Sequence, residues 1–388
     1  MNRSERINLL LEKSKSEILV IDGAMGTCLQ NLNLTAEDFG GEELDGCNEN
    51  LVITRPDVIE DIHYKYLQAG ADIIETNTFG GTPVVLAEYD LQDQYKEINS
   101  IATQLAVKAR DRFEAENPGE RRFVAGSMGP TTKAISVTGG ITFEELIENF
   151  YEQAKYLYQG GADYFLLETS QDTRNIKAGL IAINQLNAEI ENPLPVAVSG
   201  TIEPMGSMLG GQAVDALVAS LKHINLFYLG LNCATGPDFM TDHVRTMAEM
   251  ADCAVACVPN AGLPDEDGNY LETPAMMSKV LERFMKEGWI NFVGGCCGTT
   301  YGHITAFREI AKRNKARIPN ADQVSDLSGI EYLAIENDGR PYLVGERTNV
   351  IGSRKFKRLI VEEKFDEASE IAKAQVKKGA HIIDVCLA

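Results

Sequence analysis

Three cysteines occupy positions where their thiols could share one metal ion. Cys233 follows an apolar run, and Cys296 and Cys297 follow another, within the segment Gly294-Gly295-Cys296-Cys297-Gly298. Adjacent cysteines bond to each other only through a strained ring, so a shared metal explains the pair more easily, and the flanking glycines let the backbone turn both sulfurs to one side. Three thiolates with a fourth position open form a catalytic zinc site, with Zn–S distances of about 2.3 Å. The sequence therefore predicts Zn²⁺ at Cys233, Cys296 and Cys297, which are also the predicted catalytic residues.

Two other interpretations of the cysteines stay open. A thiol can pack as a small apolar group, and a closed structural zinc would need a fourth protein ligand, which Cys253 or Cys257 could supply only if the seventh strand points them toward the mouth of the barrel. Packing as an apolar group is the expected role of the cysteines other than the three predicted zinc ligands, namely Cys28, Cys47, Cys253, Cys257 and Cys386.

An open zinc centre with three sulfur ligands suits the alkylation of a substrate thiol. Zinc holds a bound thiol deprotonated at neutral pH, and a fourth sulfur gives the site an excess negative charge that keeps this sulfur nucleophilic. Zinc hydrolases more often use histidine and carboxylate ligands with an activated water. The ligand set therefore favours group transfer to sulfur over hydrolysis.

Polar residues after the other apolar runs could bind a small amino acid. Asp22, Glu75 and Glu168 can pair with an ammonium group, and Ser199 can hydrogen-bond to either end of the ligand. The backbone N–H groups of Gly23-Ala24-Met25-Gly26 can hold a carboxylate. Each acidic side chain could instead cap a helix N-terminus. We expect ligand contact for Asp22, Gly23, Ala24, Glu168 and Ser199, and for Glu75 the two roles are equally balanced.

The elements that must position these residues alternate between short apolar runs and amphipathic helices. Continuous apolar runs predict strands that are buried on both faces, as in parallel sheets. Eight such strands alternating with helices predict an α/β fold of the (β/α)8 TIM-barrel type, in which the carboxyl ends of the strands carry the chemistry. An open doubly wound sheet is the alternative, but no G-x-G-x-x-G segment follows the first strand. The predicted strands lie at 18–21, within 71–76, 123–125, within 161–169, 196–198, 228–231, 254–258 and 291–293, and predicted helices include 143–158, 173–186, 213–224, 239–250 and 273–287.

Composition and charge narrow the class of protein. The chain has 57 acidic and 36 basic residues and a net charge of -21, whereas proteins that bind nucleic acid or anionic membranes usually carry a basic surface. No run of about 18 apolar residues is present, and the N-terminus lacks the apolar core of a secretory signal. Eight cysteines in 388 residues are too sparse for a disulfide scaffold. We therefore expect a cytoplasmic enzyme with neither nucleic acid nor membrane as partner.

The pattern changes after the eighth predicted strand and its helix. Residues 1–312 form the predicted barrel, and residues 313–341, with few apolar runs, are predicted to be a linker. Residues 342–388 then start again with a strand at 342–344, a helix at 365–378 and a strand at 381–385, and carry 9 basic and 7 acidic residues. Two strands cannot close a barrel. This segment is therefore predicted to be the truncated start of a second βα barrel.

Six motifs of the chain resemble those of the homocysteine S-methyltransferases, over about residues 10 to 312. The resemblance implies a (β/α)8 barrel, zinc held by the three matching cysteines, homocysteine as methyl acceptor, and homocysteine contacts at Asp22 and Glu168. It also implies that Asn260 is a candidate for the fourth zinc position in the absence of homocysteine. The motifs are Asp-Gly-Ala-Met-Gly-Thr at 22–27, Glu-Thr-Asn-Thr-Phe at 75–79, Gly-Ser-Met-Gly-Pro at 126–130, Glu-Thr at 168–169, Asn-Cys at 232–233 and Gly-Gly-Cys-Cys-Gly-Thr at 294–299.

The last segment resembles the opening of a pterin-binding barrel. Its motifs are Val-Gly-Glu-Arg-Thr-Asn at 344–349, Gly-Ser-Arg-Lys-Phe at 352–356 and Ile-Ile-Asp-Val at 382–385. This domain order is similar to that of the cobalamin-dependent methionine synthases, and the similarity implies that methylcobalamin on a cobalamin-binding module donates the methyl group and that methyltetrahydrofolate recharges it on domains missing here. Two alternatives stay open: a homocysteine methyltransferase that uses S-methylmethionine or betaine, and a non-catalytic docking module with a structural zinc.

Overall fold

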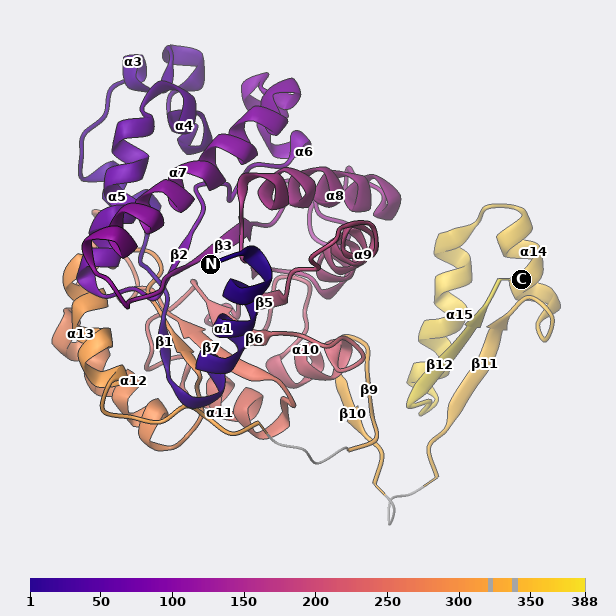
Figure 1. Cartoon of the computed structure of the whole chain (residues 1–388). Coiled ribbons are helices and arrows are strands. Elements are labelled where there is room, and N and C mark those ends of the chain that lie inside the picture. The colour runs from indigo at the N-terminus through magenta and orange to yellow at the C-terminus, as the bar shows by residue number, and fades with distance from the viewer. Residues whose placement is uncertain (320–323, 337–340, 388) are drawn as a thin grey trace. The chain divides into compact units, whose positions relative to one another are not determined.

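Eight parallel strands form one sheet whose strand order follows the sequence. The computed structural model describes residues 1–319, 324–336 and 341–387. Strands β2 to β8 pair in sequence order, β8 pairs with β1, and a bridge between Ile21 and Ile73 joins β1 to β2, so the sheet closes into a barrel (Figure 1). The predicted (β/α)8 barrel is confirmed, and the open sheet is excluded. The strands are β1 Leu19–Val20, β2 Ile73–Glu75, β3 Phe123–Met128, β4 Tyr164–Ser170, β5 Val196–Gly200, β6 Tyr228–Asn232, β7 Ala254–Val258 and β8 Phe292–Val293.

Helices form the outer layer, and Figure 1 shows them in a ring around the strands. Neighbouring helices pack together, as α7 does with both α5 and α8. Among the described residues no helix is both long enough and apolar enough to cross a bilayer. The helices of this part are α1 Arg3–Ser16, α2 Met25–Gln30, α3 Ala36–Phe39, α4 Leu51–Thr54, α5 Pro56–Ala69, α6 Pro83–Leu86, α7 Tyr95–Glu116, α8 Phe143–Gly160, α9 Thr173–Glu189, α10 Val214–Leu221, α11 Thr241–Met250, α12 Pro274–Lys286 and α13 Tyr301–Ala311.

A repeated Gly-Ala-Asp turn delivers the chain from helix to strand. Gly70 ends α5 with φ of 107°, a left-handed conformation that glycine adopts without strain. The next aspartate turns back to the sheet: Asp72 accepts a hydrogen bond from Val20 N at 3.0 Å and pairs with Arg308 at 2.6 Å. Asp163 repeats the arrangement after α8, with Val124 N at 2.8 Å. These hydrogen bonds to buried aspartates tie adjacent strands together at the end of the barrel opposite the strand carboxyl ends.

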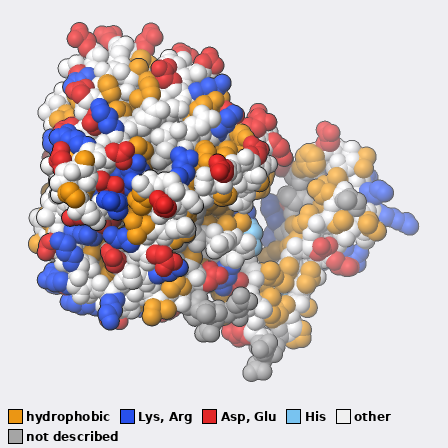
Figure 2. All heavy atoms as spheres, viewed as in Figure 1, with side chains coloured by type: hydrophobic (Ala, Val, Ile, Leu, Met, Phe, Trp, Pro, Cys, Tyr) orange, Lys and Arg blue, Asp and Glu red, His pale blue; other side chains and the backbone are white. Residues whose placement is uncertain are grey.

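The interior of the barrel is packed with apolar side chains, and α1 covers one end of it. Leu10 of α1 is fully buried against the interior residues, and in Figure 1 this helix lies in front of the strands. On the face shown in Figure 2, basic and acidic side chains are interspersed. The buried interior layer consists of Leu19, Ile21, Ile73, Phe123, Ala125, Tyr164, Leu166, Ala197, Tyr228, Ala256, Val258 and Phe292.

The segment predicted to be a linker contains a short two-stranded sheet. Strands β9 (Asp326–Ser328) and β10 (Tyr332–Ala334) pair with each other, and β9 packs on α10. Lys222 forms an ion pair with Asp326, and Ser328 Oγ donates to Ala216 O at 2.7 Å. The first compact unit thus extends from Met1 to Leu333, and the second from Ala334 to Ala388.

The second unit contains two parallel strands and two helices. They are β11 Val344–Asn349, α14 Arg354–Val361, α15 Phe365–Lys377 and β12 Ile382–Cys386. β11 pairs with β12, with Val344 opposite Ile382. The predicted helix at 365–378 and both strands are present within a few residues, whereas α14 was not predicted. Its small core consists of Phe356, Leu359 and Ala368.

Candidate active site

The three predicted zinc ligands converge at the carboxyl ends of β6 and β8. Their sulfur atoms all lie within 4.8 Å of one another, and Cys233 Sγ is 3.9 Å from Cys297 Sγ. No other group of three metal-ligating side chains is found in the part of the chain that the structure describes. Cys253 and Cys257 lie outside the group, and Cys257 is fully buried with Met240 at 3.8 Å from its sulfur. The arrangement leaves a fourth position of a tetrahedron without a protein sulfur.

Local backbone geometry turns the cysteines toward each other. Cys233 and the next residue, Ala234, have φ of 64° and 58°, so the chain turns sharply at the end of β6. Gly298 has φ of 80°, and a Cβ there would lie 2.2 Å from Tyr270 Cγ. Gly295 has no such φ, but a Cβ on it would lie 2.4 Å from Thr299 Oγ1. The glycines were expected to let the backbone turn. Gly298 does so, whereas Gly295 is needed because a side chain there would collide with Thr299.

The cluster favours negative charge on one of its three sulfurs, because the pKa of Cys297 is lowered whereas those of Cys233 and Cys296 are raised. Hydrogen bonds from Cys233 and then Cys296 lower the pKa of Cys297 to about 3. The Tyr270 hydroxyl donates to the same sulfur, and burial together with this thiolate raises the pKa of Tyr270 to about 12. A metal cation would replace the two thiol protons in this arrangement.

Three acidic side chains share the barrel mouth with the cysteines. Burial raises the pKa of Asp22 and of Glu75 well above the usual range and that of Glu168 to about 7. Asp22 accepts a hydrogen bond from Glu75 N at 3.1 Å. Glu168 accepts hydrogen bonds from the hydroxyls of Ser127 and Thr169. Among the described residues none of the three has a basic partner, so an ammonium group that binds here would favour their charged forms.

The turn at Gly23 and Ala24 is fixed by the cysteine loop. Gly295 N donates to Asp22 O at 3.1 Å, Ala24 N donates to Thr299 Oγ1 at 3.3 Å, and Gly298 N donates to Thr27 Oγ1 at 2.9 Å. Ala24 N is therefore already bonded, which the sequence did not show. The two loops form one connected wall.

Ser199 and Asn260 have different surroundings. Ser199 Oγ donates to Asn232 Oδ1 at 2.7 Å, so in this arrangement it can only accept a hydrogen bond from a ligand. Asn260 is 4% exposed, and its side-chain oxygen is buried without a hydrogen-bond partner. The next residue, Ala261, donates from its backbone to Cys297 O at 2.9 Å. Asn260 therefore lies beside the cysteine loop, but it is not among the residues that line the cavity described below, and its role as fourth ligand stays a prediction.

A cavity of about 530 Å³ joins the sulfurs to the acidic groups. Pro264, Gly268 and Tyr270 of one loop line part of it, and Tyr228 and Leu166 lie among its apolar lining residues. No lysine, arginine or histidine lines it among the described residues, whereas four carboxylates do. The predicted residues that line it are Asp22, Gly23, Ala24, Glu75, Glu168, Ser199, Cys233, Cys296 and Cys297.

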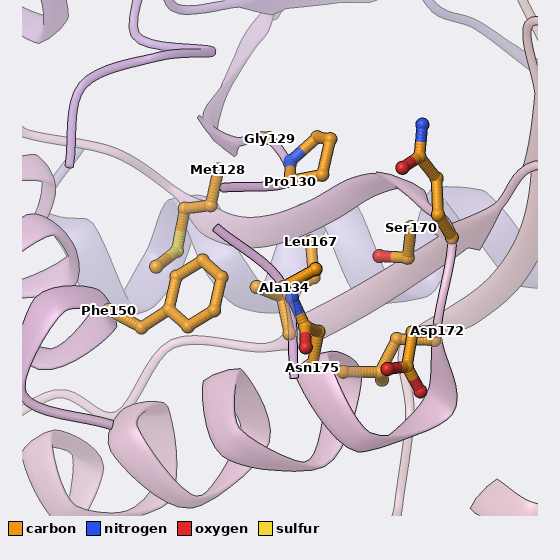
Figure 3. A pocket seen from close by; sticks show the side chains of 11 residues that line it. Met128, Gly129, Pro130, Ala134, Phe150, Leu167, Ser170, Asp172 and Asn175 are labelled. Atoms are coloured by element: carbon orange, nitrogen blue, oxygen red, sulfur yellow. The ribbon is translucent and has the colours of Figure 1, made fainter. Parts of the chain in front are cut away.

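A second cavity is too small for a substrate. Figure 3 shows it between the ends of β3 and β4 and helices α8 and α9, where Met128, Leu167, Phe150 and Asn175 line it. Its volume is about 10 Å³, which is the space of one water molecule. None of the predicted site residues lines it.

Several residues that line this cavity were not among the predicted site residues, and four of them carry polar groups that could contact a ligand or position its contacts. They are Glu49, Ser127, Asn232 and Tyr270. Ser127 and Asn232 lie at strand ends and within two of the motifs that resemble the family. Their position could therefore have indicated from the sequence that they belong to the site. Tyr270 lies in the loop between β7 and α12, closed by a bridge between Pro264 and Tyr270, and no sequence pattern marks it.

The fold and the site define a class: a (β/α)8 barrel with a three-cysteine site and an acidic cavity at the carboxyl ends of its strands. Residues 19–311 match the homocysteine S-methyltransferase profile. The chain belongs to the homocysteine S-methyltransferase family. Residues 345–388 match the profile of pterin binding enzymes.

Solved structures of a bacterial enzyme share the fold. The homocysteine methyltransferase MmuM from Escherichia coli, in its metallated form, is 24% identical, with a TM-score of 0.64 over 78% of this chain and 99% of the other. Its oxidized form is 23% identical, with a TM-score of 0.64 over 80% of this chain and 99% of the other. At these identities the likeness shows the barrel fold.

Proposed function

We propose that the barrel transfers a methyl group to the thiol of homocysteine and so makes methionine. The observation that carries the proposal is the convergence of Cys233, Cys296 and Cys297, within 4.8 Å of one another, on a cavity lined by carboxylates. The three thiols fit Zn²⁺, and we propose the buried, unpartnered side-chain oxygen of Asn260 as a fourth ligand when no substrate is present. The similar Escherichia coli enzyme is described in a metallated form, which is consistent with a metal in a barrel of this family.

The cysteines would hold zinc, which when bound lowers the pKa of a thiol and leaves its sulfur nucleophilic at neutral pH. Because of this, the protein needs no general base near the sulfur. The described residues that line the cavity include no histidine that could serve as one.

The acidic residues would bind the amino-acid end of homocysteine. Asp22 and Glu168 would accept hydrogen bonds from its ammonium group, and Glu75 and Ser199 lie in the same wall as further acceptors. The backbone at Gly23 and Ala24 lines the cavity and would face the carboxylate. Fixing both charged groups directs the side chain, and hence the sulfur, toward the cysteines.

The reaction balances without a further reagent. A bond forms between the homocysteine sulfur and the methyl carbon while the bond from that carbon to the donor breaks, and the electron pair leaves with the donor. The thiol proton is released when the amino acid binds. Tyr270 lines the same cavity and hydrogen-bonds to the sulfur of Cys297.

We propose methylcobalamin, held by a separate cobalamin-binding module, as the donor. The pterin-binding match at 345–388 supports this, because methyltetrahydrofolate on a complete pterin barrel would restore the methyl group. The proposed organisation is a barrel at 1–312, a connection at 313–341 and the start of the pterin barrel at 342–388, in the reducing cytoplasm where the thiols stay free.

A cationic donor such as S-methylmethionine or betaine is the second candidate. The cavity supports it, since four carboxylates and no basic side chain among the described residues line it, so a positive charge would be favoured there.

The deciding experiment follows the absorbance of free methylcobalamin with the zinc-loaded chain and homocysteine. We expect demethylation that C296A abolishes, together with zinc binding, while the matched variant C253S, which lies outside the cluster, keeps both. Turnover only with S-methylmethionine or betaine would move the chain to the second candidate. Full zinc content and full rate in C296A would contradict the assigned site.

A further inference from the structure

The side-chain amide of Asn232 connects three strand ends. Asn232 is 3% exposed and stands at the end of β6, next to Cys233. Its Oδ1 accepts from Thr169 N at 2.9 Å and from Ser199 Oγ at 2.7 Å, and its Nδ2 donates to Thr169 Oγ1 at 2.7 Å. The backbone oxygen of Asn232 also accepts from Thr201 Oγ1 at 3.0 Å. Three of the hydrogen bonds that the amide can form therefore hold residues of β4 and β5.

The hydrogen bonds from Asn232 hold Thr169 in a strained backbone conformation. Its φ is 52°, a left-handed conformation that is a genuine outlier for a β-branched residue. The pairing of β4 with β5 is also irregular here, between Leu167 and Ser170. Such strain persists only where surrounding contacts fix the backbone, and both the backbone N–H and the hydroxyl of Thr169 are bonded to Asn232.

The contacts continue from Thr169 to Glu168. The Thr169 hydroxyl, which accepts from Asn232, also hydrogen-bonds to the Glu168 carboxylate. Glu168 and Ser199 both line the large cavity. Without the amide, Thr169 could relax to a right-handed conformation and turn Glu168 out of the cavity wall.

We infer that Asn232 is a positioning residue that fixes Glu168 and Ser199, the ammonium-binding side of the cavity, from the strand that carries Cys233. The inference rests on the proposed function and deepens it. It explains why one strand end carries both a polar amide and a cysteine: the same turn places the sulfur and the binding site of the amino acid. Because Asn232 acts through side chains and not through the sulfurs, its loss should separate amino-acid affinity from zinc affinity.

The test measures the binding of homocysteine and of methionine to the zinc-loaded chain by calorimetry, and zinc affinity by chelator competition. We expect N232A to raise both amino-acid dissociation constants about 10- to 100-fold and to change zinc affinity by less than about threefold. The matched control is N291A. Asn291 is 1% exposed and also bonds to two segments, Val255 N at 3.0 Å and Arg317 O at 2.8 Å, but at the opposite end of the barrel. N291A should lower stability and leave amino-acid affinity unchanged.

Relief of the strain gives a second, independent readout. Glycine adopts a φ of 52° freely, so N232A/T169G should regain about tenfold of the lost affinity. If N232A does not fold, T169A and T169S test the same chain of hydrogen bonds at Thr169, which is only partly buried. T169A removes the hydroxyl and should weaken amino-acid binding by roughly threefold or more. T169S keeps the hydroxyl and should resemble the wild type. Unchanged affinity in N232A, or in T169A where N232A does not fold, or an equal loss in N291A, would overturn the inference. If the wild-type chain binds neither amino acid, the proposed function fails first, and this inference with it.

Discussion

At the scale of single residues, Glu168 should set a pH dependence of amino-acid binding. Burial raises its pKa to about 7, above the usual value for a carboxyl group, so the group is largely protonated below this pH. Only the charged form attracts an ammonium group, so affinity for methionine should rise as pH rises through 7. Methionine is a suitable probe because it has no thiol that titrates. Calorimetry from pH 6 to 8 measures the effect, and E168Q should bind weakly at every pH; a flat profile in the wild type would contradict the assignment.

His63 should make stability depend on pH, away from the site. It is fully buried on α5, neither ring nitrogen has a hydrogen-bond partner, and burial lowers its pKa from 6.5 to about 4. The unfolded chain therefore binds a proton below pH 6.5 that the folded chain binds only near pH 4. Stability should fall as pH decreases from 6.5 to 4, by roughly 3 kcal/mol from this residue, and level off below that. Denaturant unfolding of H63L should show a shallower slope over this range; an identical slope would rule the effect out.

Among the residues of the site, the sequence identified those whose side-chain chemistry is distinctive. Thiols beside glycines at strand ends have few other interpretations, and the structure brings Cys233 to within 3.9 Å of Cys297. Asn232 and Tyr270 were not identified, because neutral polar residues occur everywhere and their roles depend on partners far away in the chain. Thr169, for example, is 63 residues from Asn232. The occupied N–H of Ala24 also depends on a distant hydroxyl, that of Thr299.

At the scale of elements, the loop after β8 should not tolerate a side chain at Gly298. A Cβ there would lie 2.2 Å from Tyr270 Cγ, and φ is 80°, so G298A must move Tyr270 or the cysteines. We expect zinc affinity to fall at least about tenfold and the free energy of unfolding to fall by about 1–3 kcal/mol. The measurements are chelator competition and denaturant unfolding.

Gly302, four residues further on, is the matched control. It lies in α13, and a Cβ there would have no atom closer than 3.7 Å. G302A should therefore keep zinc affinity and gain up to about 1 kcal/mol of stability, because alanine favours the helix. Equal zinc affinity in G298A and G302A would show that the loop adapts and that the glycine is not required.

The elements of the barrel could be predicted because strands buried on both faces leave continuous apolar runs. All eight predicted strands are present, and β3 is longer than predicted because it continues through polar and small residues such as Ser127. The β9–β10 sheet and α14 were not predicted. β9 is held by polar contacts such as that of Ser328, and α14 buries only Phe356 and Leu359 between basic residues, so neither gives an apolar run.

At the scale of the whole molecule, the two units differ in how much apolar surface they bury. The first has a continuous core that includes the filled barrel interior. The second has a core of three buried residues, while Ile351 and Val361 are 83% and 75% exposed. Because apolar burial is the main stabilising contribution to folding, the second unit should open far more often than the barrel.

Hydrogen exchange on the full chain tests this difference. We expect the amides of β11, α14, α15 and β12 to exchange orders of magnitude faster than those of β3 to β7, because local opening of a small core costs little free energy. Zinc and homocysteine should raise protection around the cysteine loop and leave the second unit unchanged, since all described residues that line the large cavity belong to the first unit. Equal protection in both units would mean that further contacts stabilise residues 342–388. A change in the second unit on homocysteine binding would mean that the units are energetically coupled, and the barrel could then not be treated as a complete amino-acid binding module.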